Sequence, residues 1–511
     1  MAEEAKSLFY KIKPLSDRLP SVAQPEGHVH FRMKILWVAA ALITYFFLSN
    51  VYVYGLDQTK TLDLFAQYRT IMAGSSGSLL QLGIGPIVTA SIVMQLLVGS
   101  KIVNLDLTKK EDKDCYHSVL KLLVIFMIFV EAIPQVFGYL IPSDQFASKF
   151  TLSGARALIV LQIAIGSYFV FLMDEVISKW GIGSGISLFI AAGVAESLFT
   201  GTLNWNPVLP NAETSLSNPP AGTIPKVIYF LVACSPAQFS DYGYQEILIG
   251  QPNPLIALIG TICIFLVVAY LESVRIELPI SHGSARGVRG KYPIKLIYAS
   301  NIPVILMSAL LANISMLALL LYNNDILSKI PFLGHNPILG YFRDGNTSAA
   351  GGLAWYLSAP SGITSWLVPI FNPTIDGNIH SPLMNIMRVV IYTSVMILGS
   401  VLFAKFWVNT TNMNSRAVAA KIQRSGMHIS GFRSDTRVIE QILEKYIPTV
   451  TVLSGAIVGA LAAFADLIGT TGGASGTGVL LTVGILIRFY ETIGREQMME
   501  MNPMVREFFG G

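Results

Sequence analysis

The chain has 511 residues, of which 52% are hydrophobic and only 13% are charged. Because a soluble domain carries about a quarter charged residues, this composition excludes an ordinary soluble protein and indicates a membrane protein with many spans. The net charge of +4 is small. No cofactor or metal site is expected, because Cys115, Cys234 and Cys263 lack CxxC spacing and the histidines form no HExxH motif.

The predicted elements begin with a short amphipathic helix within residues 1–34, which we expect on the cytoplasmic membrane surface and ended by Pro20. No cleavable signal peptide is expected, because the first apolar run is long enough to be a full span. Residues 491–511 are predicted to form a cytoplasmic tail. Ten apolar runs have the length of membrane-spanning helices, at 35–55, 78–98, 118–141, 152–173, 184–201, 253–271, 296–321, 383–407, 449–468 and 474–490.

Residues 224–237 and 351–371 are two further apolar segments on the predicted outer side. The first is too short to cross a bilayer, whereas the second is long enough. The distribution of Lys and Arg decides the second case, because these residues favour cytoplasmic segments. With ten spans and a cytoplasmic N-terminus, cytoplasmic segments hold 27 of the 35 Lys and Arg residues, whereas an eleventh span would place the seven of 405–445 outside. We therefore expect 351–371 to form a re-entrant or interfacial hairpin.

Four spans open with a break rich in Gly, Ser or Pro. The breaks are GIGPIV at 83–88, GIGSGISLFI at 181–190, SNIPVI at 300–305 and GGASGTGVLLTV at 472–483. Broken helix is tolerated in a membrane only beside other protein or a water-filled cavity. The breaks form two pairs entered from opposite sides, which is typical of an inverted repeat with the functional site between its halves. The alternative is that the glycines serve helix packing and that Gly-rich apolar helices resemble one another by chance.

The predicted spans are nearly free of ionisable residues, with Glu131 and Glu196 as the clearest exceptions. Transporters and pumps place such groups in the middle of the membrane. Instead, branched aliphatic residues follow the four breaks, and a ring of them would dewet a narrow passage and block ions. Ordinary packing is the alternative role for each residue alone. The candidate ring consists of Ile84, Val88, Ile186, Ile190, Ile305 and Leu481.

Two long segments on the predicted cytoplasmic side, 273–296 and 408–448, are basic and only mildly apolar. A bias of positive charge toward the cytoplasm explains a few such residues near span ends. It does not require two loops of this length with basic residues clustered in Gly-rich turns, which suit an anionic partner, RNA included. The candidate partner-binding residues are Arg286, Arg289, Lys291, Arg424, Arg433 and Arg437.

Six runs together resemble the SecY family, the channel subunit of the Sec protein translocon, in its archaeal form. They are SLLQLGIGPIVTASIVMQLL at 78–97, LMDEVISKWGIGSGISLFI at 172–190, KYPIKLIYASNIPVIL at 291–306, GGLAWYLS at 351–358, GFRSD at 431–435 and SGTGVLLTV at 475–483. The resemblance covers nearly the whole chain. It implies an all-α membrane protein with ten transmembrane helices in two inverted five-helix halves, 35–201 and 253–490, around a central hourglass pore.

The resemblance also implies roles for particular residues. The constriction of the pore falls on the same six aliphatic residues. A lateral gate lies between the second and third helices and the seventh and eighth, with Thr89, Glu131 and Asn313 as its polar groups. A plug, a short helix between the first two spans, falls on Leu64, Phe65, Ala66, Gln67, Tyr68, Arg69, Thr70, Ile71, Met72, Ala73 and Gly74.

The predicted function is a passive protein-conducting channel that translocates secretory polypeptides and releases transmembrane segments sideways into lipid. The resemblance implies a docked ribosome, a nascent chain with a signal or anchor sequence, and small companion subunits resembling SecE and the beta subunit. We expect a multi-pass protein of the plasma membrane with both termini in the cytoplasm. A secondary transporter is the rival class, since broken helices in inverted repeats also describe those proteins. An intramembrane enzyme is disfavoured, because no nucleophile and base form a recognisable pair.

Overall fold

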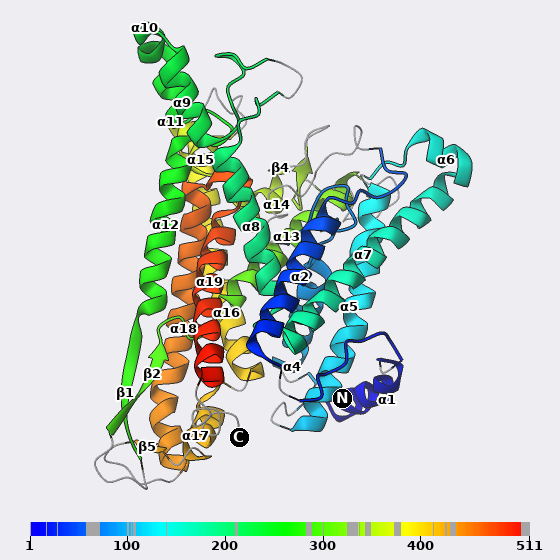
Figure 1. Cartoon of the computed structure of the whole chain (residues 1–511), viewed down its shortest axis with the longest axis vertical. Coiled ribbons are helices and arrows are strands. Elements are labelled where there is room, and N and C mark those ends of the chain that lie inside the picture. Colours follow the sequence, from blue (N-terminus) through cyan, green and yellow to red (C-terminus); the bar gives the residue numbers. More distant parts are fainter. Residues whose placement is uncertain are drawn as a thin grey trace.

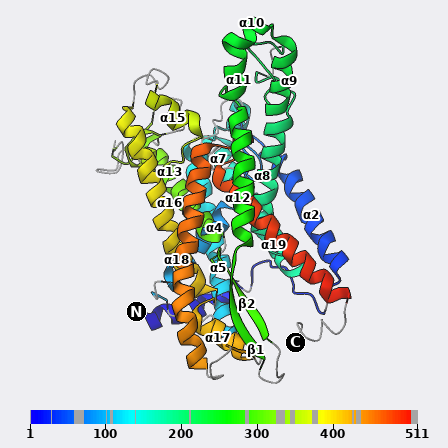
Figure 2. The ribbon, with the colours of Figure 1, turned by 90° about the vertical axis from the view of Figure 1, so that its left-hand side faces the viewer.

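The computed structural model is a bundle of long helices that run close to the long axis of the molecule (Figure 1). Figure 2 shows the same bundle from the side, with shorter elements extending beyond it at both ends. The structure describes residues 2–16, 18–27, 29–57, 72–99, 102–103, 105, 109–138, 140–209, 213–282, 289–299, 301–323, 336, 338–342, 349–371, 380–411, 413–424, 427–429 and 436–501.

Ten helices of the described residues correspond to the ten predicted spans. The first half holds α2 (Phe31–Ser49), α4 (Gly85–Gly99), α5 (Lys110–Gly138), α7 (Leu152–Trp180) and α8 (Gly185–Leu203). The second half holds α12 (Leu255–Ser273), α13 (Ile302–Asn323), α16 (Pro382–Thr410), α18 (Thr436–Ile468) and α19 (Gly476–Met501). Nine of these are long and apolar enough to cross a membrane, whereas α4 has only 15 residues. Helices suit the interior of a membrane because their backbone hydrogen bonds are satisfied internally.

The short α4 corrects the predicted span over 78–98. Residues 78–84 form turns rather than helix, and the helix begins only at Gly85. The cause is local, because Gly77 and Gly83 have φ angles of +69° and +54°, which L side chains rarely adopt. The break that the sequence indicates is therefore longer than expected and replaces the first two turns of the span.

The end of the molecule that carries α1 and the last turns of α19 also carries the two basic segments (Figure 1). Residues 273–296 form a hairpin of β1 (Arg275–His282) and β2 (Arg289–Lys295), in which Arg275 pairs with Lys295. Strand β5 (Met427–Ile429) pairs with the far end of β1. The predicted loop over 408–448 is wrong in two places, since it contains α17 (Ser415–Arg424) and the first three turns of α18. Buried Ile422, Ile439 and Leu443 join these helices in a separate apolar core.

The opposite end of the bundle carries two further segments, of which the one with α9 to α11 projects beyond the helices (Figures 1 and 2). The first contains α9 (Thr223–Ala233), α10 (Pro236–Gln238), the π-helix η1 (Phe239–Gly243) and α11 (Tyr244–Leu248). Its 11-residue α9 is too short to span, as expected. The second contains the small strands β3 (Tyr341–Phe342) and β4 (Ala349–Gly351), followed by α14 (Gly352–Leu357) and α15 (Ile363–Phe371). Residues 351–371 thus form two short helices in place of one span, and Trp366 donates to the carbonyl of Leu467 at 2.9 Å.

The N-terminal helix α1 (Ala2–Ser16) lies across the lower end of the bundle in Figure 1. It ends at Ser16, four residues earlier than the predicted stop at Pro20. The chain beyond it follows the end of α7, where Lys179 donates to the carbonyl of Val22 at 2.7 Å and Trp180 to that of Ala23 at 2.8 Å. These contacts hold the N-terminal segment against the first half of the bundle.

Candidate pore constriction and lateral gate

The break before α4 brings two aliphatic side chains into the centre of the bundle. Gly83 lets the chain turn so sharply that a Cβ on it would overlap the carbonyl oxygen of Met72. The amide of the next residue, Ile84, donates to that same oxygen at 2.7 Å. This bond fixes Ile84 at the mouth of α4, and Val88 follows one helical turn later.

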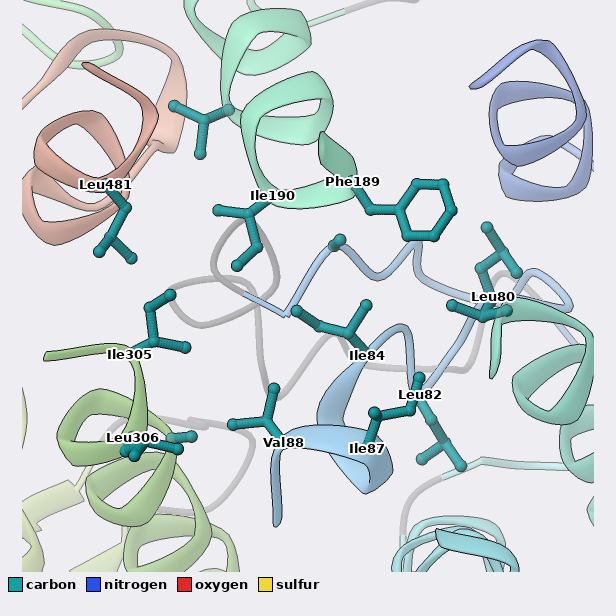
Figure 3. Close-up of a cluster of buried hydrophobic side chains, with 14 of the residues drawn as sticks. Leu80, Leu82, Ile84, Ile87, Val88, Phe189, Ile190, Ile305, Leu306 and Leu481 are labelled. Atoms are coloured by element: carbon teal, nitrogen blue, oxygen red, sulfur yellow. The ribbon is translucent and has the colours of Figure 1, made fainter. Parts of the chain in front are cut away.

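Three more helices supply the remaining members of the predicted ring. Helix α8 begins at Gly185 and carries Ile186 and Ile190, α13 carries Ile305, and α19 carries Leu481. Figure 3 shows Ile84, Val88, Ile190, Ile305 and Leu481 gathered around one central space. All five are buried, between 0% and 6% exposed, and Ile186 is half-buried against the same cluster. The structure therefore brings together five of the six predicted residues, and Ile186 packs against the same apolar core; we call the six residues the aliphatic ring.

The same close-up shows apolar neighbours that the sequence analysis did not single out. Leu80, Ile87, Phe189 and Leu306 surround the aliphatic ring and belong to the same buried cluster. A passage of such side chains has no group that could replace the hydration shell of an ion, so it excludes water and ions without charge selection.

Most of the predicted plug, Leu64 to Ile71, lies outside the described residues. Its last three residues, Met72, Ala73 and Gly74, are described and sit against the aliphatic ring. Ala73 is 1% exposed, and its carbonyl accepts a hydrogen bond from the hydroxyl of Tyr45 at 3.1 Å. Together with the bond from Ile84 to Met72, this contact anchors the C-terminal end of the segment directly beside the constriction.

The three polar residues predicted for the gate come together across two halves of the bundle. Thr89 on α4 donates to a carboxylate oxygen of Glu131 on α5 at 2.7 Å. Asn313 on α13 in turn donates to the hydroxyl oxygen of Thr89 at 3.2 Å. We call these residues the gate triad. Buried Glu131 thus has a neutral hydrogen-bond donor beside it, which reduces the cost of placing a carboxyl group in a membrane.

A second polar pair near the gate was missed. The side-chain amide of Gln81 donates to that of Gln135 at 3.3 Å, and Gln135 also approaches the sulfur of Met316 on α13 at 3.9 Å. Gln is costly in an apolar span unless it is hydrogen-bonded. Two glutamines within predicted spans were therefore a signal that could have identified the pair.

Comparisons with known proteins agree with this geometry. A family model described as SecY matches residues 78–490, and a model described as the plug domain of Sec61p matches residues 43–77. The chain belongs to the SecY family. The predicted plug at 64–74 falls within the residues that the plug model matches.

Relatives cover almost all of the chain. The protein translocase subunit SecY of Archaeoglobus fulgidus is 43% identical, over 99% of both chains. That of Methanothermobacter thermautotrophicus is 44% identical, over 99% of this chain and all of its own. A solved protein-conducting channel covers 96% of this chain and 98% of its own, with 37% identity and a TM-score of 0.75. Sec61 in a canine ribosome–channel complex from the endoplasmic reticulum matches over the same shares, with 37% identity and a TM-score of 0.72. The chain is therefore a protein-conducting channel with a plug domain.

A cavity of about 710 Å³ with a mixed polar and apolar wall lies beside α15. Its wall combines residues from α2, α8, α12 and α18 with the end of the plug segment, Ala73 to Ser76. Small polar side chains such as Ser49, Ser197 and Thr200 line it, together with Glu196. These polar side chains allow the cavity to hold water.

The predicted partner-binding residues gather at the opposite end of the bundle. Arg289 and Lys291 belong to β2, Arg424 ends α17, and Arg437 is exposed on the second residue of α18. Arg286 and Arg433 lie outside the described residues. The hairpin of β1 and β2 and the helices α17 and α18 lie side by side in Figures 1 and 2, so both basic segments contribute to one face.

Proposed function

We propose that the aliphatic ring is the seal of the channel and that it closes around a polypeptide as the polypeptide passes. The observation that carries this proposal is the meeting of buried aliphatic side chains from α4 and α8 with those from α13 and α19. Aliphatic side chains make non-directional apolar contacts, so they can pack against an extended chain of varying side chains and still exclude water. No chemical step is needed, and the energy for movement comes from outside the channel.

The gate triad is proposed to hold the lateral exit closed in the resting state. Interhelical hydrogen bonds in membranes contribute on the order of 0.6 kcal/mol each. A seam held by contacts of this size opens when an apolar segment inserts between α4 and α13. Leu or Ile gains about 0.5 kcal/mol at the centre of a span, whereas Arg or Asp loses about 3 kcal/mol. Segments that are sufficiently apolar therefore leave sideways, and hydrophilic segments continue through the ring.

The basic face is proposed as the docking surface for a ribosome. Support comes from its exposed Arg437 and from the position of both basic segments on one face. The related canine Sec61 is part of a ribosome–channel complex. Small companion subunits resembling SecE and the beta subunit would complete the channel, because relatives are named as subunits of a translocase. Phosphate-rich RNA is the chemistry that such a basic face binds.

The proposed location is the plasma membrane, with both termini on the cytoplasmic side. Helix α1 and the last turns of α19 lie at the same end of the bundle as the basic segments. An excess of Lys and Arg marks cytoplasmic segments, so the basic face, α1 and the C-terminal end of α19 share the cytoplasmic side. The cavity beside α15 then opens to the outside.

The seal is tested by removing three of its side chains at once, with Ile84→Gly, Ile190→Gly and Ile305→Gly in one channel. We expect this channel to conduct ions at rest in a planar bilayer, because water can enter the widened passage. The control replaces Ile159, Ile163 and Leu311 by glycine, because these residues are equally buried but lie outside the ring. It removes a similar volume and adds three glycines, so a general loosening of the bundle would affect both channels. Equal resting conductance in the two channels would refute the seal.

A further inference from the structure

The N-terminus of α8 is capped by a carboxylate of the preceding helix, α7. Asp174, six residues before the end of α7, accepts a hydrogen bond from the amide of Ile186 at 2.9 Å. The amide of Gly185 also hydrogen-bonds this carboxylate. The residue at the usual capping position, Ser184, makes no side-chain bond to the helix. Asp174 therefore takes over the role that an N-cap side chain normally has.

Helix α19 begins in the same way in the other half. Asp466, near the end of α18, accepts from the amide of Thr477 at 3.0 Å and from its hydroxyl at 2.7 Å. The hydroxyl of Tyr392 on α16 donates to the same carboxylate at 2.7 Å. Asp466 is 4% exposed, so these donors take the place of the water that would otherwise solvate it.

Helices α8 and α19 begin the same number of residues before a member of the aliphatic ring. Each helix starts with a glycine, Gly185 or Gly476, and a ring residue lies five positions later, Ile190 or Leu481; α8 carries Ile186 in addition. Both glycines press against the preceding helix beside its aspartate. A Cβ on Gly185 would lie 2.6 Å from the Cα of Asp174, and one on Gly476 would overlap the backbone of Ala465. Carboxylate, glycine and ring residue thus form the same constellation twice.

The unpaired amides at a helix N-terminus explain what this arrangement of carboxylate and glycine does. The first amides of a helix have no partner within the helix, and inside a membrane no water replaces one. A carboxylate at that position makes charge-assisted bonds and complements the helix dipole. Each aspartate therefore ties the start of a ring-bearing helix to the end of its predecessor. Slippage of α8 or α19 along its axis would break these bonds and leave polar groups unsatisfied.

We propose that Asp174 and Asp466 are a matched pair of positioning residues, which fix the depth at which Ile190 and Leu481 meet in the aliphatic ring. The proposal rests on the proposed function of the ring as a seal, but it concerns the position of the ring residues rather than their effect on ions. The two aspartates are not members of the aliphatic ring. They act through the helices that they cap.

The position of the ring residues is measured with a pair of thiols introduced by Ile190→Cys and Leu481→Cys. The full-length chain, with Cys115, Cys234 and Cys263 replaced by alanine, is reconstituted in lipid vesicles, and the rate of disulfide formation under mild oxidation is recorded. Adding Asp174→Leu or Asp466→Leu removes the carboxylate while keeping the side-chain volume. We expect either change to slow the reaction by about tenfold or more, as the loss of bonds to a charged group implies.

The conservative variants Asp174→Asn and Asp466→Asn separate positioning from a general structural role. Asparagine keeps one oxygen that can accept the helix amide, so these variants are expected to react within about threefold of the parent. If a leucine variant fails to fold, the disulfide rate of the asparagine variant can still be measured. The control Ser167→Ala on α7 removes a buried hydroxyl that has no hydrogen-bond partner, and it should not change the rate.

Two results would overturn the proposal. One is a leucine variant that reacts at the rate of the parent, and the other is an asparagine variant that reacts as slowly as leucine. Failure of the seal itself would look different. In that case Ile190→Gly would leave the resting conductance unchanged, while the disulfide rates would still depend on the two aspartates.

Discussion

The two halves of the channel meet along two seams that are built in opposite ways. The gate seam joins α4 and α5 to α13 and α16, and the rear seam joins α8 to η4 (Thr471–Gly473) and the start of α19. Side chains bridge the gate seam, as in the bond from Asn313 to Thr89. Backbone meets backbone at the rear seam, where a Cβ on Gly201 would overlap Gly472.

The two seams also differ in what lies beside their glycines, a side chain at the gate seam and backbone at the rear seam. At the gate seam, a Cβ on Gly99 would lie 2.9 Å from the ring of Phe406, a side chain that can rotate away. At the rear seam, a Cβ on Gly472 would overlap the carbonyl of Ser197, which is fixed in α8. A side-chain contact can be exchanged for another at little cost, whereas interlocked backbones cannot separate without losing all of their packing. This difference fits the proposal that the gate seam parts while the rear seam holds the halves together.

The largest expected effect comes from filling the rear seam with Gly472→Val. The new side chain would overlap Ser197 and adopt a φ angle of +82°, so we expect a loss of more than about 3 kcal/mol. Thermal unfolding of the detergent-solubilised channel measures this loss. The matched control is Gly473→Val, because Gly473 has a φ angle of +67° but nothing within 4 Å of its would-be Cβ. If both variants unfold at the same temperature, backbone strain rather than close packing governs this seam.

The two seams also differ in how far the sequence predicts them. The gate triad could be placed only through the resemblance to the SecY family, whereas the ring could be placed because aliphatic residues follow conspicuous breaks. The contact of Gly201 with Gly472 left no such trace, since small residues occur throughout membrane helices and nothing in the sequence pairs two of them. The capping by Asp174 and Asp466 was also missed, because the carboxylate and the helix that it caps belong to different elements. Spans follow from local composition, whereas contacts between distant glycines or between neighbouring helices depend on the tertiary fold.

A smaller effect is expected from removing the side-chain bond that locks η4. The amide of Gly472 donates to the side-chain oxygen of Asn253 at 2.7 Å, and the side-chain amide of Asn253 donates to the carbonyl of Ala221 at 2.8 Å. Asn253 has a φ angle of +55°, so Asn253→Gly removes both bonds without straining the backbone. We expect a loss of about 1–2 kcal/mol in the free energy of unfolding.

Thermal unfolding again provides the measurement for Asn253→Gly. The control is Asn50→Ala. Asn50 and Asn253 line the same cavity, but Asn50 is exposed and its side chain bonds only to the end of its own helix. A loss as large as that of Gly472→Val would show that the rear seam depends on hydrogen bonds more than on backbone contact. A loss near zero would leave close packing as its sole support.

The smallest effect is expected at the gate seam. Asn313→Ala removes the bond to Thr89, and one such bond contributes on the order of 0.6 kcal/mol, or roughly threefold in an equilibrium constant. The closed seam loses this stabilisation, so signal segments slightly less hydrophobic than those normally required should be translocated. A series of signal sequences with graded leucine content measures this threshold. Thr393→Val on α16 is the control, because its buried hydroxyl has no partner and its shape is preserved.

The Asn313→Ala result bears directly on the comparison of the seams. The free energy of unfolding should change little, since the seam is designed to part, while the threshold moves. A variant that unfolds as readily as Gly472→Val, with an unchanged threshold, would show that the gate seam holds the halves together as firmly as the rear seam. In that case the rear seam would not be the fixed side and the gate seam would not be the opening side. The channel would then have to open by another route.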